Sequence, residues 1–111
     1  MSLVRGDIVY LAVKGPYTGK PRPAVIVQST ETIAYRDSIT VCPLSGMLID
    51  APLFRVRVPA NAHNGLAKTS DIMVDKIVTV PKAALDGEAI GGLTDSQLER
   101  LDRALTYWLS L

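Results

Sequence analysis

The sequence has few of the residues that supply disulfides or soft metal ligands. It contains one cysteine and one histidine among 111 residues. A single cysteine, Cys42, cannot form an internal disulfide, which fits a reducing cytoplasm. One histidine and one cysteine cannot make a zinc site by themselves. The composition therefore disfavours metal-dependent catalysis, and we expect no cofactor.

Long apolar runs are also missing. The run at residues 8–13 is too short for a secretory signal or a membrane span, so we expect a cytoplasmic protein without a membrane partner. No internal repeat, low-complexity segment or linker divides the chain. We therefore expect one domain over residues 1–111.

The net charge of +1 hides an uneven distribution. Residues 1–82 carry ten Lys/Arg and six Asp/Glu, giving +4, whereas residues 83–111 carry two and five, giving −3. A basic body with an acidic terminal element favours an anionic partner on the body. An ordinarily mixed surface is the alternative.

Short β-branched runs separated by Gly, Pro, Asn and Asp predict strands through the first eighty residues. The expected strands are 8–13, 24–28, 39–42, 54–58, 72–74 and 77–80. Strict alternation in 54–58 puts Arg55 and Arg57 on one face of their strand. Strands of this length and spacing indicate a strongly bent small barrel.

The convincing helix lies at the end of the chain. Thr94 and Gln97 form a capping-box pattern, and Gly91-Gly92 before it predicts a hinge or turn. An apolar stripe at helical spacing follows, and we expect it to pack on the core: Leu98, Leu101, Leu105, Trp108 and Leu109. The predicted fold is a β-barrel closed or flanked by one carboxy-terminal helix.

The segment at residues 19–28 carries Arg22 between Pro21 and Pro23. Flanking prolines hold the backbone near extended geometry, so the guanidinium is mounted on a stiffened chain. Pro23 fits only if it lies at the start of a strand. A turn with a solvated arginine is the alternative.

Ser45 and Gly46 follow a predicted strand, so the hydroxyl and nearby N–H groups are placed to donate to a phosphate. An ordinary Ser-Gly turn is the alternative. Asp71 and Asp75 flank an apolar run. On one continuous strand they would lie roughly 13 Å apart, too far to share a metal ion.

Several other polar residues have a simpler interpretation. His63, a conceivable general base, precedes an Asn-Gly turn signal and is expected in an exposed turn. Cys42 is expected as a small buried apolar group. Arg55 and Arg57 are suited to contact phosphates or unstacked bases, with a solvated barrel face as the alternative.

Four stretches together resemble the MazF/PemK family of toxin–antitoxin ribonucleases. They are residues 5–9 (Arg-Gly-Asp-Ile-Val), the arginine-proline segment 19–28, residues 70–80, and 92–94 with the terminal helix. The resemblance covers nearly the whole chain in the expected order. It implies a mainly β fold, a small SH3-like barrel (CcdB/PemK-like) with a C-terminal α-helix, and a homodimer. It also implies metal- and cofactor-free cleavage of single-stranded mRNA, and a cognate acidic antitoxin.

The same resemblance assigns residues. The family's catalytic arginine falls on Arg22, its threonine on Ser45, and an aspartate used by some members on Asp75. Serine keeps the hydroxyl but loses the methyl that restricts rotation. An arginine of one subgroup falls on Met73, which leaves an Asp/Arg acid–base pair in doubt.

The implied mechanism is attack of the 2′-hydroxyl on the adjacent phosphate, giving a 2′,3′-cyclic phosphate and a 5′-hydroxyl. Arg22 would stabilise charge, Ser45 would bind a phosphate oxygen, and Asp75 would orient Arg22 or the RNA. Residues 14–20 are expected to form a basic loop that gates the site and meets the antitoxin. The residues expected to bind RNA are Lys14, Lys20, Arg55, Arg57 and Lys76.

Two other functions remain open from the sequence. One is a non-catalytic toxin of the same fold that poisons DNA gyrase, whose contacts would lie at the end of the terminal helix. Here that helix ends in Trp108-Leu109-Ser110-Leu111, which favours packing over a polar contact surface. The other is a catalytically dead RNA-binding module, prompted by Ser45 and Met73.

Overall fold

The computed structural model describes residues 2–12 and 21–111. The expected RNA contacts Lys14 and Lys20 lie outside this part of the chain. The strands are β1 (Asp7–Leu11), β2 (Arg22–Ile26), β3 (Ser38–Ser45), β4 (Arg55–Val58), β5 (Ser70–Met73), β6 (Val78–Pro81) and β7 (Gly91–Gly92). The helices are α1 (Thr30–Ile33) and α2 (Asp95–Leu109), with 3₁₀ turns η1 (Val74–Lys76) and η2 (Lys82–Ala84).

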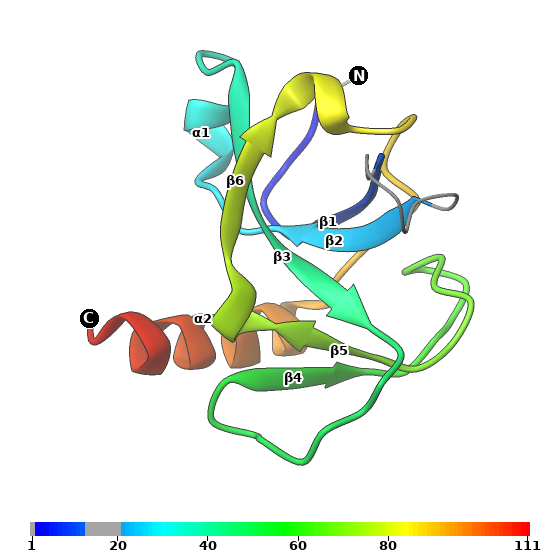
Figure 1. Cartoon of the computed structure of the whole chain (residues 1–111), viewed down its shortest axis with the longest axis vertical. Helices are drawn as coiled ribbons and strands as arrows, with labels where there is room; N and C mark the ends of the chain where they lie inside the picture. The colour runs from blue at the N-terminus through cyan, green and yellow to red at the C-terminus, as the bar shows by residue number, and fades with distance from the viewer. Residues whose placement is uncertain (1, 13–20) are drawn as a thin grey trace, which may run out of the picture.

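Strand β3 connects the two halves of the molecule (Figure 1). Its first half pairs with β6 and its last two residues pair with β5, while β2 pairs with its middle. The full order is β4-β5-β3-β2-β1-β7, with β6 beside β3 off this path. All these pairs are antiparallel.

The sheet closes on itself at the end of β1. Leu11 forms a bridge to Leu85, just after β6, and the Ala12 N–H donates to the Ala84 carbonyl at 2.8 Å. This contact joins the end of β1 to the segment that follows β6, while β4 stays an edge strand paired with β5. The predicted small barrel is therefore confirmed.

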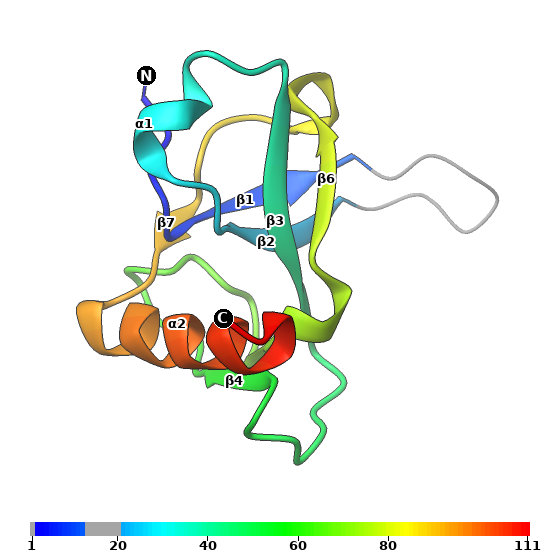
Figure 2. The same ribbon diagram turned by 90° about the vertical axis from the view of Figure 1, so that its left-hand side faces the viewer.

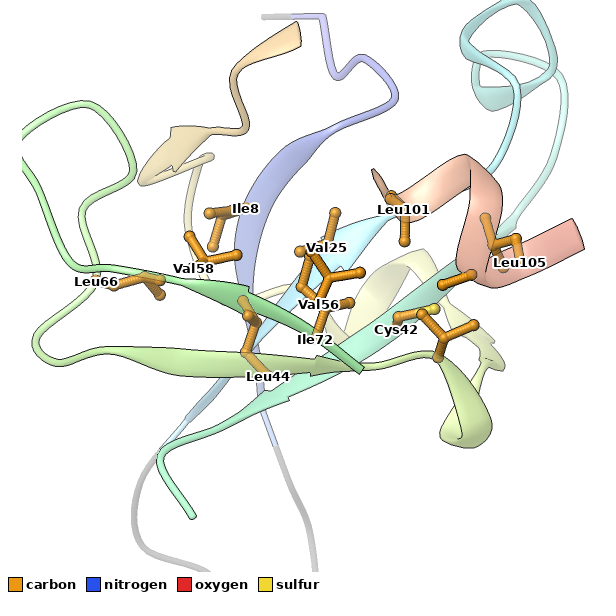
Figure 3. Packing of buried hydrophobic residues seen from close by; sticks show 12 residues of the cluster. Ile8, Val25, Cys42, Leu44, Val56, Val58, Leu66, Ile72, Leu101 and Leu105 are labelled. Carbon is orange, nitrogen blue, oxygen red and sulfur yellow. The ribbon is translucent and has the colours of Figure 1, made fainter. Parts of the chain in front are cut away.

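Two apolar clusters lie on opposite faces of the shared strands, because successive side chains of a strand alternate. One fills the barrel: Val9, Leu11, Ala24, Ile26, Ile33, Ile39 and Val41. The other lies between the sheet and α2, and includes Ile8, Val25, Cys42, Leu44, Val56, Ile72 and Leu101 (Figure 3). The site described below lies on the other face of β4 and β5, away from this second cluster.

Helix α2 crosses the lower half of the molecule next to β4 (Figure 2). Its capping box is present: Thr94 Oγ1 accepts from the Gln97 N–H at 3.1 Å, and Gln97 Oε1 accepts from the Thr94 N–H at 2.9 Å. Leu101 and Leu105 are buried as predicted, but Trp108 and Leu109 are 43% and 45% exposed. The expectation that the whole stripe packs on the core is therefore wrong for its last turn.

Other expectations also need correction. The two strands predicted at 72–74 and 77–80 are present as β5 and β6, but the 3₁₀ turn η1 lies between them, so the separation of roughly 13 Å calculated for Asp71 and Asp75 on one strand does not apply. Gly91-Gly92 is a strand paired with β1, not a hinge. A side-chain carbon on Gly91 would collide with the backbone of His63 and Asn64, which explains the glycine. The short helix α1 was not predicted, because four residues carry too little periodicity.

Candidate active site on the barrel rim

Arg22 is the first residue of β2 and lies exposed on the rim of the barrel. Its strand partner is Leu11, and the next residues on its face, Ala24 and Ile26, are fully buried inside the barrel. Pro23 is the second residue of the strand, near its start as required. Among the described residues Arg22 forms no salt bridge, and its guanidinium carries several donors in a planar fork.

Ser45 is the last residue of β3, the strand that pairs with β2. Ala24 lies opposite Pro43 in the β2–β3 ladder, and continuing that register by two residues sets Arg22 opposite Ser45. Directly opposed residues are about 5 Å apart and share a face of the sheet. The Ser45 Oγ accepts a hydrogen bond from the Met47 N–H at 3.1 Å, which leaves the hydroxyl proton free to be donated.

A polar row extends from this pair across two more strands. Ser45 pairs with Asp71 in β5, and Asp71 pairs with Arg57 in β4. Each pairing sets side chains on the same face, so the row runs Arg22, Ser45, Asp71, Arg57. We call these four residues the rim row. The adjoining row, Leu44, Ile72 and Val56, faces the core, as alternation requires.

Asp71 is the member that sequence reasoning missed, having been considered only as a metal ligand. It is 1% exposed, and its Oδ1 accepts from Arg57 Nε at 2.8 Å. Its Oδ2 accepts from the Ile49 N–H at 2.8 Å, which ties the β3–β4 loop to β5. Burial alone would raise the pKa of Asp71, but the hydrogen bonds from Arg57 and Ile49 and nearby positive charge hold the pKa below its usual value.

Arg57 and Arg55 share a face, as predicted, but have different surroundings. The Arg57 side chain is 48% exposed, while that of Arg55 is 8% exposed. Arg55 Nε lies 3.3 Å from Asp75 Oδ1, and neither atom has a hydrogen-bond partner. Both arginines therefore cannot be equally open to RNA.

Asp75 lies apart from the rim row. It belongs to η1, where Val74 bonds to the backbone of Phe54 beside Arg55. The structure therefore brings Arg22, Ser45 and Arg57 together and places Asp75 with Arg55. Lys76, the other η1 residue expected at the RNA surface, is exposed.

The simpler interpretations of His63 and Cys42 agree with the structure. His63 is exposed in a turn in which its N–H donates to Asn61 Oδ1 at 2.8 Å. Cys42 is fully buried, and burial raises the pKa of its thiol to about 12. Within residues 2–12 and 21–111, no three His, Cys, Asp or Glu side chains gather as a metal site. No helix in that part of the chain is long and apolar enough to cross a membrane.

A cavity of about 460 Å³ adjoins the rim row between the β3–β4 loop, β4 and α2. Its lining includes Arg57 and Asp71 from the row, and Arg100, Arg103 and Tyr107 from the helix. Arg100 Nη2 donates to the Arg57 carbonyl, which ties α2 to β4. The phenyl ring of Phe54 lies 5.3 Å from the Trp108 ring, so the loop and the end of α2 also meet.

Comparisons with known proteins agree with this geometry. The solved structure of the Mycobacterium tuberculosis toxin MazF-mt6 matches with a TM-score of 0.80 and 27% identity, over 95% of this chain and 97% of that one. An endoribonuclease solved with its cognate antitoxin from a mycobacterial species has the same fold, with a TM-score of 0.76, 19% identity, and 99% and 97% coverage.

The bent barrel with its flanking helix thus places this chain in the class of small barrel toxins. A curated relative, the probable endoribonuclease MazF of Mycolicibacterium smegmatis, is 41% identical over 107 residues, covering 96% of each chain. The model of the PemK-like, MazF-like toxins of type II toxin–antitoxin systems matches residues 4–109. The chain belongs to this family, which confirms the resemblance seen in the sequence.

Proposed function

We propose that this MazF-type endoribonuclease toxin cleaves single-stranded mRNA at the barrel rim without a metal ion or cofactor. The observation that carries the proposal is the β2–β3 register, whose continuation by two residues from the Ala24–Pro43 pair sets Arg22 opposite Ser45. A fixed cation and a hydroxyl on adjacent strands match a phosphate that gains charge in the transition state. The relevant compartment is the cytoplasm, which holds messenger RNA.

In the proposed reaction the ribose 2′-oxygen attacks the adjacent phosphorus and the bond to the 5′-oxygen breaks. The 2′ proton goes to a base, and the departing 5′-oxygen gains a proton. The products are a 2′,3′-cyclic phosphate and a 5′-hydroxyl. Arg22 stabilises charge on the non-bridging oxygens through the positive charge and planar donor fork of its guanidinium. Ser45 donates its hydroxyl proton to one of those oxygens.

The remaining assigned residues form the approach to this centre. Arg57 and Lys76 are exposed cations suited to phosphates on either side of the cut. Arg55 is largely buried against Asp75, which favours a supporting role for both. The catalytic assignment of Asp75 stays a prediction, and the general base is unassigned.

The proposed partners follow from the surface. A cationic rim that binds RNA is also complementary to an acidic antitoxin segment, which would inhibit by occupying the same charges. Two copies of the chain would pair through apolar side chains that the monomer leaves exposed. They lie in the β3–β4 loop and at the end of α2: Met47, Leu48, Ile49, Leu53, Tyr107, Trp108, Leu109 and Leu111. Sedimentation of the purified toxin tests the homodimer.

The test of function is cleavage of a defined RNA in the presence of a chelator, with the new ends mapped. We expect cyclic phosphate ends, and a loss of roughly 10²–10³ in rate for Arg22→Ala, by analogy with lost oxyanion donors. Binding without cleavage would support the dead module instead. The family match leaves the gyrase-poison alternative without support, and a gyrase inhibition assay would check this.

A further inference from the structure

A third cation lies beside the Arg22–Ser45 pair. Lys68 belongs to the loop between β4 and β5, and its side chain crosses the backbone of Gly46. A side-chain carbon placed on Gly46 would lie 2.7 Å from Lys68 Nζ and closer still to Lys68 Cε. The end of the Lys68 side chain therefore occupies the space over Gly46, the residue that follows Ser45 in the chain.

The main chain under Lys68 is held in place. Ser70 opens β5, is 4% exposed, and its hydroxyl donates to the Lys68 carbonyl at 3.0 Å. The residue after Ser70 is Asp71 of the rim row, so Lys68 is anchored to the strand that pairs with Ser45. The Lys68 side chain itself is exposed and forms no salt bridge with another described residue.

Arg22 and Lys68 thus reach the end of β3 from different elements. Arg22 approaches along β2, and Lys68 approaches over Gly46 from the β4–β5 loop. In the proposed reaction the phosphate bears one charge at the start and two when the 2′-oxygen has bonded. Cations placed where the second charge develops lower the barrier most, because the gain is larger in the transition state than in the ground state.

We propose that Lys68 is a further catalytic residue, whose ammonium contacts a non-bridging oxygen of the cleaved phosphate beside Ser45. It shares with Arg22 the charge that develops during attack. The ammonium acts as a point charge on a flexible stem, so it follows the oxygen as the phosphorus changes geometry. This inference rests on the proposed ribonuclease function.

The first test is the kinetics of Lys68→Met with a matched charge control. Arg36→Met removes one exposed positive charge beyond the opposite end of β3, a strand whose length from Ser38 to Ser45 is roughly 23 Å. We expect Lys68→Met to lower kcat roughly 10- to 100-fold with KM changed less than about threefold. Arg36→Met should leave kcat at the parent value. Lys68→Arg should keep more activity than Lys68→Met, because it keeps the charge.

The second test restores the ammonium chemically and so separates charge from folding. Lys68→Cys is alkylated with 2-bromoethylamine, which rebuilds a lysine-like side chain with sulfur in the stem. Cys42 is buried with a raised thiol pKa, so the introduced cysteine is the one that reacts. We expect alkylation to raise kcat at least tenfold over the unmodified variant, while the parent treated in the same way does not change.

The outcomes separate this inference from the function on which it rests. If the parent cleaves RNA and Arg22→Ala does not, but Lys68→Met cleaves at the parent rate, the role of Lys68 is overturned and the function stands. A loss in Lys68→Cys that alkylation fails to reverse also overturns it. If the parent itself leaves RNA intact, both proposals fall.

Discussion

Strands β4 and β5 with the following turn carry two arginine–aspartate pairs that differ in almost every physical respect. In the Arg57–Asp71 pair the carboxylate is buried and the arginine is 48% exposed, with Nε to Oδ1 at 2.8 Å. In the Arg55–Asp75 pair both side chains are largely covered, the closest approach is 3.3 Å, and the facing atoms lack hydrogen-bond partners.

The difference separates two uses of the same pair of residue types. Asp71 receives hydrogen bonds from two elements, so it fixes the β3–β4 loop and aims the exposed arginine. Burying the Arg55–Asp75 pair costs desolvation energy that little hydrogen bonding offsets. Removing one partner of such a pair is nevertheless destabilising, because it leaves the other charge buried without a counter-charge. The Arg57–Asp71 pair positions an exposed arginine at the surface, whereas the Arg55–Asp75 pair holds η1 against β4.

The largest expected effect comes from Asp75→Asn. It leaves the buried Arg55 guanidinium without its counter-charge, and we expect the free energy of unfolding to fall by about 3 kcal/mol. Urea unfolding followed by Trp108 fluorescence measures this. The control is Asp102→Asn, which breaks the more exposed Arg5–Asp102 pair at 2.7 Å and should cost less than about 1 kcal/mol. Parent-like stability with a hundredfold loss of kcat would instead make Asp75 catalytic.

A smaller effect is expected for Arg57→Gln. Glutamine can still donate to Asp71, so the loop stays tethered while the exposed positive charge is lost. We expect KM for RNA to rise roughly tenfold, and the slope of log affinity against log salt to fall by about 0.7. Titration of a labelled RNA at several salt concentrations measures both. An unchanged salt slope would show that Arg57 does not meet a phosphate. Arg36→Gln is the matched control.

The smallest effect concerns acid. Because the pKa of Asp71 is lower in the folded chain than its unfolded value near 3.9, the unfolded chain binds more protons between the two values. The stabilisation is complete above the unfolded value and is lost as pH falls through the folded one. At pH 6 the parent should therefore unfold at a higher urea concentration than Asp71→Asn, and this difference between the two midpoints should narrow as the pH falls toward 3. A gap that stays constant would contradict the charged pairing.

Most of the fold was predictable because local pattern and global fold agree. The alternation in 54–58 gave β4, and the capping box at Thr94 gave the start of α2. The prediction failed at Gly91-Gly92, where glycine is required by a neighbouring backbone that is distant in sequence. It also failed for Trp108, because helical spacing cannot show where the surface that the helix covers comes to an end.

The proposed site was predictable only in part. Arg22 and Ser45 followed from the family resemblance and from the stiffened, strand-ending segments in which they lie. Asp71 and Lys68 were not recognised, because the position of Asp71 depends on cross-strand register and that of Lys68 on a loop that folds back over Gly46. The equal status given to Arg55 and Arg57 failed for the same reason. Arg55 and Arg57 lie on the same face of β4, but this does not determine how deeply each side chain is buried.

Gly91 limits which substitutions the segment before α2 can tolerate during evolution. The segment leading into α2 is attached to the barrel by main-chain hydrogen bonds, from Ile90 to Ile8, Gly92 to His63 and Leu93 to Gly6. Main-chain attachments do not depend on side-chain identity. The exposed face of α2 can therefore change in sequence without altering these main-chain attachments. Replacing Gly91 would disturb these attachments, because its side chain would collide with the backbone of His63 and Asn64.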